Sequence, residues 1–204
     1  MKKMLLLFTS SLFLVTYSHA QLSKGQKMIG GELSFTSSNN EYDGFQGAQK
    51  ITSVNIAPQI GFGLSKNWVV GAGLGFTYES QKAGSGSDYK LTANIYSVGL
   101  FARKFHPFAE KFGVFGELGT AGGFGKVKES QGSLEAESDV STIAVTLRPG
   151  FYFKATKRLI LEANFGGLSY SHLTSKDEMG YKSNRSEFRF QLTSLLGFGA
   201  QFVL

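Results

Sequence analysis

Every second residue from Trp68 to Tyr78 is apolar, and this alternation limits the folds open to the chain more than any other feature. The apolar set is Trp68, Val70, Ala72, Leu74, Phe76 and Tyr78, and the residues between them are mostly glycine. A period of two indicates a β-strand with one apolar face. A tilted strand needs roughly 9–11 residues to cross a bilayer. The same pattern recurs up to the last residue, so the whole chain is expected to consist of such strands.

Eight segments show this alternation, and the connections between them alternate in length. The expected strands are residues 26–37, 51–64, 67–80, 89–104, 111–126, 139–154, 157–171 and 186–204. Longer, polar connections are expected at 38–50, 81–88, 127–138 and 172–185, and the other three are short. An even number of strands with short turns at one end is typical of outer-membrane barrels. The sequence therefore predicts an all-β fold, an eight-stranded antiparallel transmembrane β-barrel with three short periplasmic turns and four longer extracellular loops.

Ionisable residues occupy the strand face opposite to the Phe, Leu and Val residues. Three carboxylates and two guanidiniums would enter a narrow barrel, where an unpaired charge is costly, so we expect them to form a hydrogen-bonded network. The expected pairs on neighbouring strands are Glu117–Arg148 and Glu162–Arg189. Replacing Arg148 with leucine should then cost about 3–5 kcal/mol. The predicted barrel-interior polar network is Glu32, Glu117, Arg148, Glu162 and Arg189.

A soluble, lipocalin-type barrel is the main alternative fold. It would turn the apolar faces inward around a ligand and the charged faces outward. In this chain that arrangement would leave either a charged cavity or a large apolar exterior, which soluble monomers do not tolerate. The alternation therefore favours a barrel whose exterior faces lipid.

Three places interrupt the simple pattern. In the fourth expected strand Ala93 and Ile95 suggest one outward face, whereas Val98 and Leu100 suggest the other, so a bulge near Ser97 is expected. Pro58 and Pro149 both fall on outward positions, and each is expected near a bulge because proline removes a ladder hydrogen bond.

Aromatic and basic residues mark the two expected membrane interfaces. Lysines and arginines, among them Arg103, collect beside the short turns, where they could contact anionic headgroups. Transmembrane barrels carry aromatic girdles at both interfaces. The predicted girdle residues are Trp68, Phe105 and Phe112 at the short-turn end, and Phe76, Tyr78 and Phe124 at the other end.

The first twenty residues are typical of a secretory signal peptide. Lys2 and Lys3 precede an apolar run, and Ser18 and Ala20 place small residues at a cleavage site before Gln21. We therefore expect a signal peptide over 1–20, a barrel domain over 21–204, and a location in the bacterial outer membrane. The chain contains no cysteine, so disulfide and thiolate chemistry are excluded.

Few residues could support catalysis or metal binding. Outside the signal peptide the chain has two histidines, His106 beside a short turn and His172 near the outer end of the seventh strand. By alternation Ser171 would face lipid and His172 would not, which disfavours a Ser–His pair. The sequence shows no metal-ligand spacing, no phosphate-binding loop and no basic helical stripe for nucleic acid. We expect neither an enzyme nor a cofactor.

The segments IGFGLSKNWVVGAGLGFTYES at 60–80 and LLGFGAQFVL at 195–204 resemble the small outer-membrane β-barrel proteins of the OmpA/OmpX-like porin fold, the outer membrane protein β-barrel domain family. This resemblance implies contact with outer-membrane lipid and lipopolysaccharide. It also implies that the barrel-assembly machinery recognises the last strand, through Phe198, Phe202 and Leu204, although family members usually end in an aromatic residue.

Three functions are compatible with these features. The leading hypothesis is a monomeric barrel with a structural or surface-interaction role, its interior plugged by the Glu/Arg network and its loops binding a partner that the sequence does not name. The first alternative is a narrow porin for small solutes. The second alternative is a lipid A-modifying outer-membrane enzyme.

Overall fold

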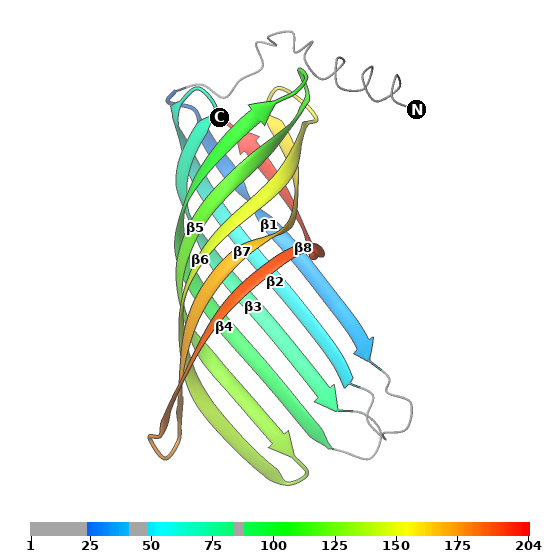
Figure 1. Cartoon of the computed structure of the whole chain (residues 1–204), viewed down its shortest axis with the longest axis vertical. Coiled ribbons are helices and arrows are strands. Elements are labelled where there is room, and N and C mark those ends of the chain that lie inside the picture. The colour runs from blue at the N-terminus through cyan, green and yellow to red at the C-terminus, as the bar shows by residue number, and fades with distance from the viewer. Residues whose placement is uncertain (1–23, 41–48, 84–87) are drawn as a thin grey trace, which may run out of the picture.

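The computed structural model describes residues 24–40, 49–83 and 88–204, which form one closed antiparallel barrel (Figure 1). Each strand pairs with the next one in the sequence, and β8 closes the barrel on β1. The predicted eight-stranded barrel is confirmed, while the expected signal peptide lies outside the described residues. The strands are β1 (Lys27–Asn40), β2 (Gln49–Ser65), β3 (Trp68–Ala83), β4 (Tyr89–Pro107), β5 (Phe112–Gln131), β6 (Leu134–Lys154), β7 (Leu159–Asp177) and β8 (Lys182–Val203).

The two ends of the barrel differ. The connections β2–β3, β4–β5 and β6–β7 are short and lie at the end that carries the C-terminus, which we call the short-turn end (Figure 1). The tightest of them closes at Ser65↔Trp68, with Asn67 at a φ of 67°, a conformation that asparagine tolerates. We call the opposite end the hairpin end.

The segments expected as the third and fourth loops are mostly paired strand. The β5–β6 hairpin continues to Gln131↔Leu134, and its turn has Gly132 at a φ of 60°. The β7–β8 hairpin continues to Lys176↔Lys182. The loop assignments at 127–138 and 172–185 were therefore wrong, because polar residues on both faces still allow backbone pairing. Among the described strands, the β5–β6 hairpin reaches furthest at the hairpin end (Figure 1).

Strand β4 is regular over its whole length. Its register with β3 and with β5 never shifts, so the bulge expected near Ser97 does not exist. Val98 and Leu100 are exposed on the outer wall, and Ala93 is buried on the inner one. The expectation was wrong because Ala93 and Ile95 are apolar although they lie on the inner face of β4.

The two prolines behave differently. The β6–β7 register shifts between Leu147 and Gly150, so the bulge expected near Pro149 is confirmed. Pro58 pairs with Gly31, and the β2–β3 register is the same on both sides of it, so no bulge forms there.

A larger irregularity separates the two halves of β7 and β8. Their register shifts between Phe165 and Gly167, with Gly166 at a φ of 60° and Gly167 at 136°. Beyond this bulge the outward face of β7 carries Tyr170 and His172, while Ser171 faces inward, the reverse of the expectation. On its other side, β8 pairs with β1 only from Met28↔Val203 to Leu33↔Phe198.

The exterior is apolar and the aromatic residues form rows on it. At the hairpin end of the apolar zone the Phe76, Tyr96 and Phe124 rings follow one another, with centroids 5.2 and 6.2 Å apart. At the short-turn end Phe112 stacks on Phe151 at 5.8 Å, and Lys104 lies 5.3 Å from the Trp68 ring. Tyr78 shares the outward face of β3.

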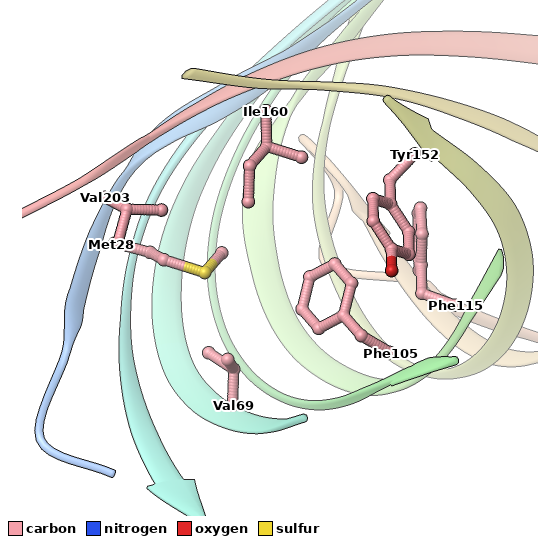
Figure 2. Close-up of a cluster of buried hydrophobic side chains, with 7 residues drawn as sticks. All are labelled: Met28, Val69, Phe105, Phe115, Tyr152, Ile160 and Val203. Atoms are coloured by element: carbon pink, nitrogen blue, oxygen red, sulfur yellow. The ribbon is translucent and has the colours of Figure 1, made fainter. Parts of the chain in front are cut away.

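An apolar cluster fills the barrel interior at the short-turn end, and we call it the apolar plug (Figure 2). Phe105 lies in it, 5.1 Å from Tyr152 and 5.8 Å from Phe115, so its assignment to the exterior girdle was wrong. Glycine makes room for these rings, since a Cβ on Gly150 would lie 2.4 Å from the Phe115 ring. The members of the plug are Met28, Val69, Phe105, Phe115, Tyr152, Ile160 and Val203.

Candidate functional site

A fully buried arginine on β4 lies at the centre of the barrel interior. The exposed fraction of Arg103 is 0%, and those of Glu117 and Glu162 are 2% and 3%. Arg103 Nε donates to Glu117 Oε2 at 2.8 Å, and Nη2 donates to the same oxygen. Arg103 Nη1 donates to both oxygens of Glu162, at 2.6 and 2.7 Å. One guanidinium thus connects β4 with β5 and β7.

A second guanidinium extends this arrangement to β1 and β6. Arg148 Nη2 donates to Glu117 Oε1, so the expected Glu117–Arg148 pair forms. Arg148 Nη1 donates to Glu32 Oε2 at 2.8 Å, and Glu32 Oε1 also lies 3.7 Å from Arg103 Nη2. We call Glu32, Arg103, Glu117, Arg148 and Glu162 the charge network.

Arg189 is not part of the charge network, and the expected Glu162–Arg189 pair does not form. Arg189 is 51% exposed and donates to Glu187 Oε1 at 2.6 Å. In the β7–β8 register Arg189 lies opposite Ser169, whereas Glu162 lies opposite Gly199. Neighbouring strands alone do not bring two side chains together, because the position along the ladder also has to match.

The sequence contained a signal for Arg103 that the expected bulge concealed. If the alternation of Val98 and Leu100 continues without a break, Arg103 falls on the inward face, and it pairs directly with Glu117 in the β4–β5 register. The aromatic residues of β4 and β5 support this position. The Arg103 guanidinium carbon lies 4.7 Å from the centroid of the Phe115 ring and 5.3 Å from that of Phe101.

The interior is closed on one side of the network and hollow on the other. The apolar plug covers Arg103 from the short-turn end. A cavity of about 160 Å³ lies on the hairpin side, where Gln59, Ser97, Thr146 and several glycines line it beside Arg148. Accordingly the Arg148 side chain is 34% exposed, while Arg103 is completely covered. Water therefore reaches the network from the hairpin side.

Several buried polar atoms around the network have no hydrogen-bond partner. They are Gln59 Nε2, Arg148 Nε, both polar atoms of the Asn164 side chain and Gln201 Oε1. Gln201 Nε2 does donate to Glu162 Oε2, at 3.2 Å. Amide side chains from β2, β7 and β8 therefore hold both unpaired donors and unpaired acceptors in the buried interior.

The histidines lie apart from the charge network. His172 Nδ1 is 2.9 Å from Ser186 Oγ on the exposed outer face of the β7–β8 hairpin, with the Tyr170 hydroxyl 3.5 Å from the same oxygen. His106 packs edge-on against Phe108 at the short-turn end. Among the described residues, no group of acidic or histidine side chains is arranged to hold a metal ion. In the same residues, no helix is long and apolar enough to cross a membrane.

Comparison of the sequence with protein-family models and with curated proteins found no match. Among solved structures, the chain is similar to the translocator domain of autotransporter NalP from Neisseria meningitidis, with 18% identity, 98% of this chain and 67% of that chain covered, and a TM-score of 0.48. It is also similar to a major outer membrane protein from Thermus thermophilus (14% identity, 88% and 99% covered, TM-score 0.46). A third similar structure is Ail, the attachment invasion locus protein of Yersinia pestis (16%, 89% and 99%, TM-score 0.44).

The geometry itself defines a class of barrel. Its outer wall is apolar with aromatic rows at two levels, and its inner wall carries paired charges. This is the arrangement of small barrels of the outer-membrane type, in which the lipid-facing and lumen-facing residues alternate.

Proposed function

We propose that this protein is a non-enzymatic, non-conducting barrel of the bacterial outer membrane that holds two long hairpins at the cell surface. The observation that carries the proposal is the interior closed in two successive layers, the apolar plug and the charge network. A barrel closed in this way serves as an anchor, and the β5–β6 and β7–β8 hairpins are then the parts available to a partner.

The outer-membrane location is supported by the exterior surface. Large apolar side chains such as Leu74, Leu100 and Phe198 are more than half exposed on it. Contiguous apolar surface of this kind marks a membrane or partner interface. The short-turn end would face the periplasm and the hairpin end the outside, in contact with outer-membrane lipid and lipopolysaccharide. We further propose a monomer, whose assembly uses Phe198, Phe202 and Leu204 on the last strand.

Conductance in planar bilayers tests the closed interior. The purified full-length barrel should give no discrete channel events. A variant in which Phe105, Phe115 and Tyr152 are all replaced by alanine, with its folded state verified by heat-modifiable migration, should conduct more than the wild type. Discrete events from the wild-type protein would contradict the proposal and favour the narrow porin.

The surface role is tested by shortening one hairpin without disturbing its turn. Because Lys128 pairs with Glu137 and Gln131 with Leu134, deleting 128–131 together with 134–137 removes whole pairs and retains Gly132 and Ser133. Intact cells carrying this variant should lose the cross-linked extracellular partner of the wild type while the barrel stays folded. An unchanged cross-linking pattern for this hairpin and for a similarly shortened β7–β8 hairpin would contradict a surface-interaction role.

A lipid A-modifying activity is disfavoured by the positions of its candidate residues. Ser171 and His172 lie on opposite faces of β7, and His172 instead contacts Ser186. Lipid A from cells that produce the wild type, Ser186→Ala or His172→Ala should be identical. Modification that depends on either residue would refute the non-enzymatic role.

A further inference from the structure

The charge network is not balanced. It contains three carboxyl groups, on Glu32, Glu117 and Glu162, and two guanidiniums, on Arg103 and Arg148, so with every group ionised its formal charge is 2 − 3 = −1. Among the described residues, no other charged side chain forms an ion pair with these five. The neighbouring strands contribute Gln59 from β2, Val69 and Gly71 from β3 and Gln201 from β8, and Arg189 of β8 is paired with Glu187 instead.

The three carboxyl groups differ in how many guanidinium nitrogens donate hydrogen bonds to them. Glu117 accepts from both arginines through both of its oxygens. Glu32 accepts twice from Arg148 and lies beside the cavity that water reaches. Glu162 accepts from a single guanidinium nitrogen, Arg103 Nη1, through both of its oxygens, and its side chain is 0% exposed. An uncompensated buried charge is costly, and a buried acid becomes neutral to avoid that cost.

The amides next to Glu162 are suited to a carboxyl proton. Gln201 contacts Glu162 Oε2 at 3.2 Å, and Gln201 Oε1 is buried with no donor. The two ends of a glutamine amide are interchangeable in such a contact. Rotated about its last bond, Gln201 would accept from a protonated Oε2, while Arg103 Nη1, which donates to both Glu162 oxygens, keeps its hydrogen bond to Oε1. Asn164 Oδ1, also buried without a donor, is a second acceptor on the same face of β7.

We propose that the barrel interior binds one proton at neutral pH, carried by Glu162, which leaves two carboxylates balanced by two guanidiniums. The proton comes from water, and no other bond changes. The unfolded chain exposes Glu162 to water and leaves it ionised at neutral pH. Folding therefore takes up a proton, and the stability of the barrel should fall as the pH rises from neutral to alkaline.

Infrared spectroscopy of the folded full-length protein in detergent tests the proton directly. The wild type should show the carbonyl band of a protonated carboxylic acid at neutral pH, and the band should shift when water is replaced by D2O. Glu162→Gln should abolish this band, whereas Glu137→Gln, which neutralises a carboxyl outside the charge network, should retain it. Absence of the band in the wild type, or its survival in Glu162→Gln, would overturn the proposal.

Stability measurements provide the second test. Glu162→Gln places a neutral amide where we infer a neutral acid and needs no proton on folding, so its urea midpoint at neutral pH should be at least that of the wild type, and it should fall less at alkaline pH. Glu117→Gln, the same change at the fully paired carboxylate, is the matched control and should lower the midpoint at both pH values. Equal destabilisation by both variants would contradict the proposal.

A sodium ion is the competing way to balance the network. In that case the wild type would lose stability when choline replaces sodium, and no acid band would be present, which would also refute a bound proton. The infrared result does not depend on conductance. If the barrel conducts and shows the acid band, only the proposed function is refuted. If the barrel is closed and lacks the band, only the bound proton is refuted.

Discussion

At the scale of single residues, Arg103 is the side chain that organises the interior. Its guanidinium contacts two carboxylates from different strands and three aromatic rings, with none of its surface exposed. Arg148 makes comparable contacts but is partly exposed. Removing one partner of a buried ion pair costs far more than removing an exposed one, because the remaining charge has no water to solvate it.

Replacing Arg103 with leucine should therefore lower the free energy of unfolding by about 3–5 kcal/mol, since it leaves both Glu117 and Glu162 without their main partner. Arg148→Leu should cost less than Arg103→Leu. Unfolding in urea, followed by the fluorescence of Trp68, the single tryptophan, measures both. Lys157→Leu, an exposed position in the β6–β7 turn, is the control and should change stability by no more than about 0.5 kcal/mol. Equal effects at 103 and 157 would contradict the buried position of Arg103.

The β5–β6 hairpin offers a residue-scale prediction about pH. Hydrogen bonds from Lys126 and Lys128 hold the pKa of the Glu137 carboxyl below its usual value. The contribution of Glu137 to hairpin stability is therefore present above its ordinary pKa and is lost as the pH falls through the lowered value. A carboxyl NMR titration should show this low pKa, and Lys126→Met should move it back towards the ordinary value. An unchanged titration in Lys126→Met would contradict the assignment.

At the scale of elements, the bulge at Gly166 and Gly167 decides which side chains of β7 face inward. On the short-turn side of it Glu162 and Asn164 lie in the interior, and on the hairpin side Tyr170 and His172 lie on the exterior. The bulge also moves the outer half of β8, so that Arg189 lies opposite Ser169. One local irregularity thus accounts for the reversed Ser171 and His172, whereas Arg189 lies too far along the ladder from Glu162 in either register.

Gly167→Ala should destabilise the barrel by about 1–3 kcal/mol, because a φ of 136° is strained for any residue with a Cβ. The new Cβ would also lie 2.3 Å from the Leu147 carbonyl oxygen. Gly122→Ala is the matched control, since a Cβ on Gly122 meets nothing within 4 Å. Urea unfolding of the two variants measures the difference. If both variants had wild-type midpoints, the bulge would not require glycine.

At the scale of the whole molecule, the barrel has an apolar exterior and a charged interior. Neighbouring residues on one strand, such as Leu100 and Phe101, therefore lie in different environments, the first 63% exposed and the second packed against the apolar plug. A soluble barrel would have the opposite arrangement. The separation of an apolar outer face from a charged inner face thus belongs to the complete barrel wall and not to any single strand.

The absence of cysteine from the chain allows this arrangement to be tested with single labels. A fluorophore on Leu100→Cys should be quenched by brominated acyl chains in reconstituted vesicles, because that side chain faces lipid. A fluorophore on Ser97→Cys, which lines the interior cavity on the same strand, should be quenched by a water-soluble quencher instead. The same response at both positions would refute a lipid-facing exterior.

The period-two alternation determined the number of strands, their order and the apolar face of most of them, because these depend only on local side-chain pattern and on connection length. The inward positions of Glu117, Arg148 and Glu162 followed from the same pattern. Only the tertiary structure decided the partner of Glu162, the burial of Arg103 and the exclusion of Arg189. Those depend on the register between strands, and a bulge of a few residues changes the register while it leaves the alternation on either side intact.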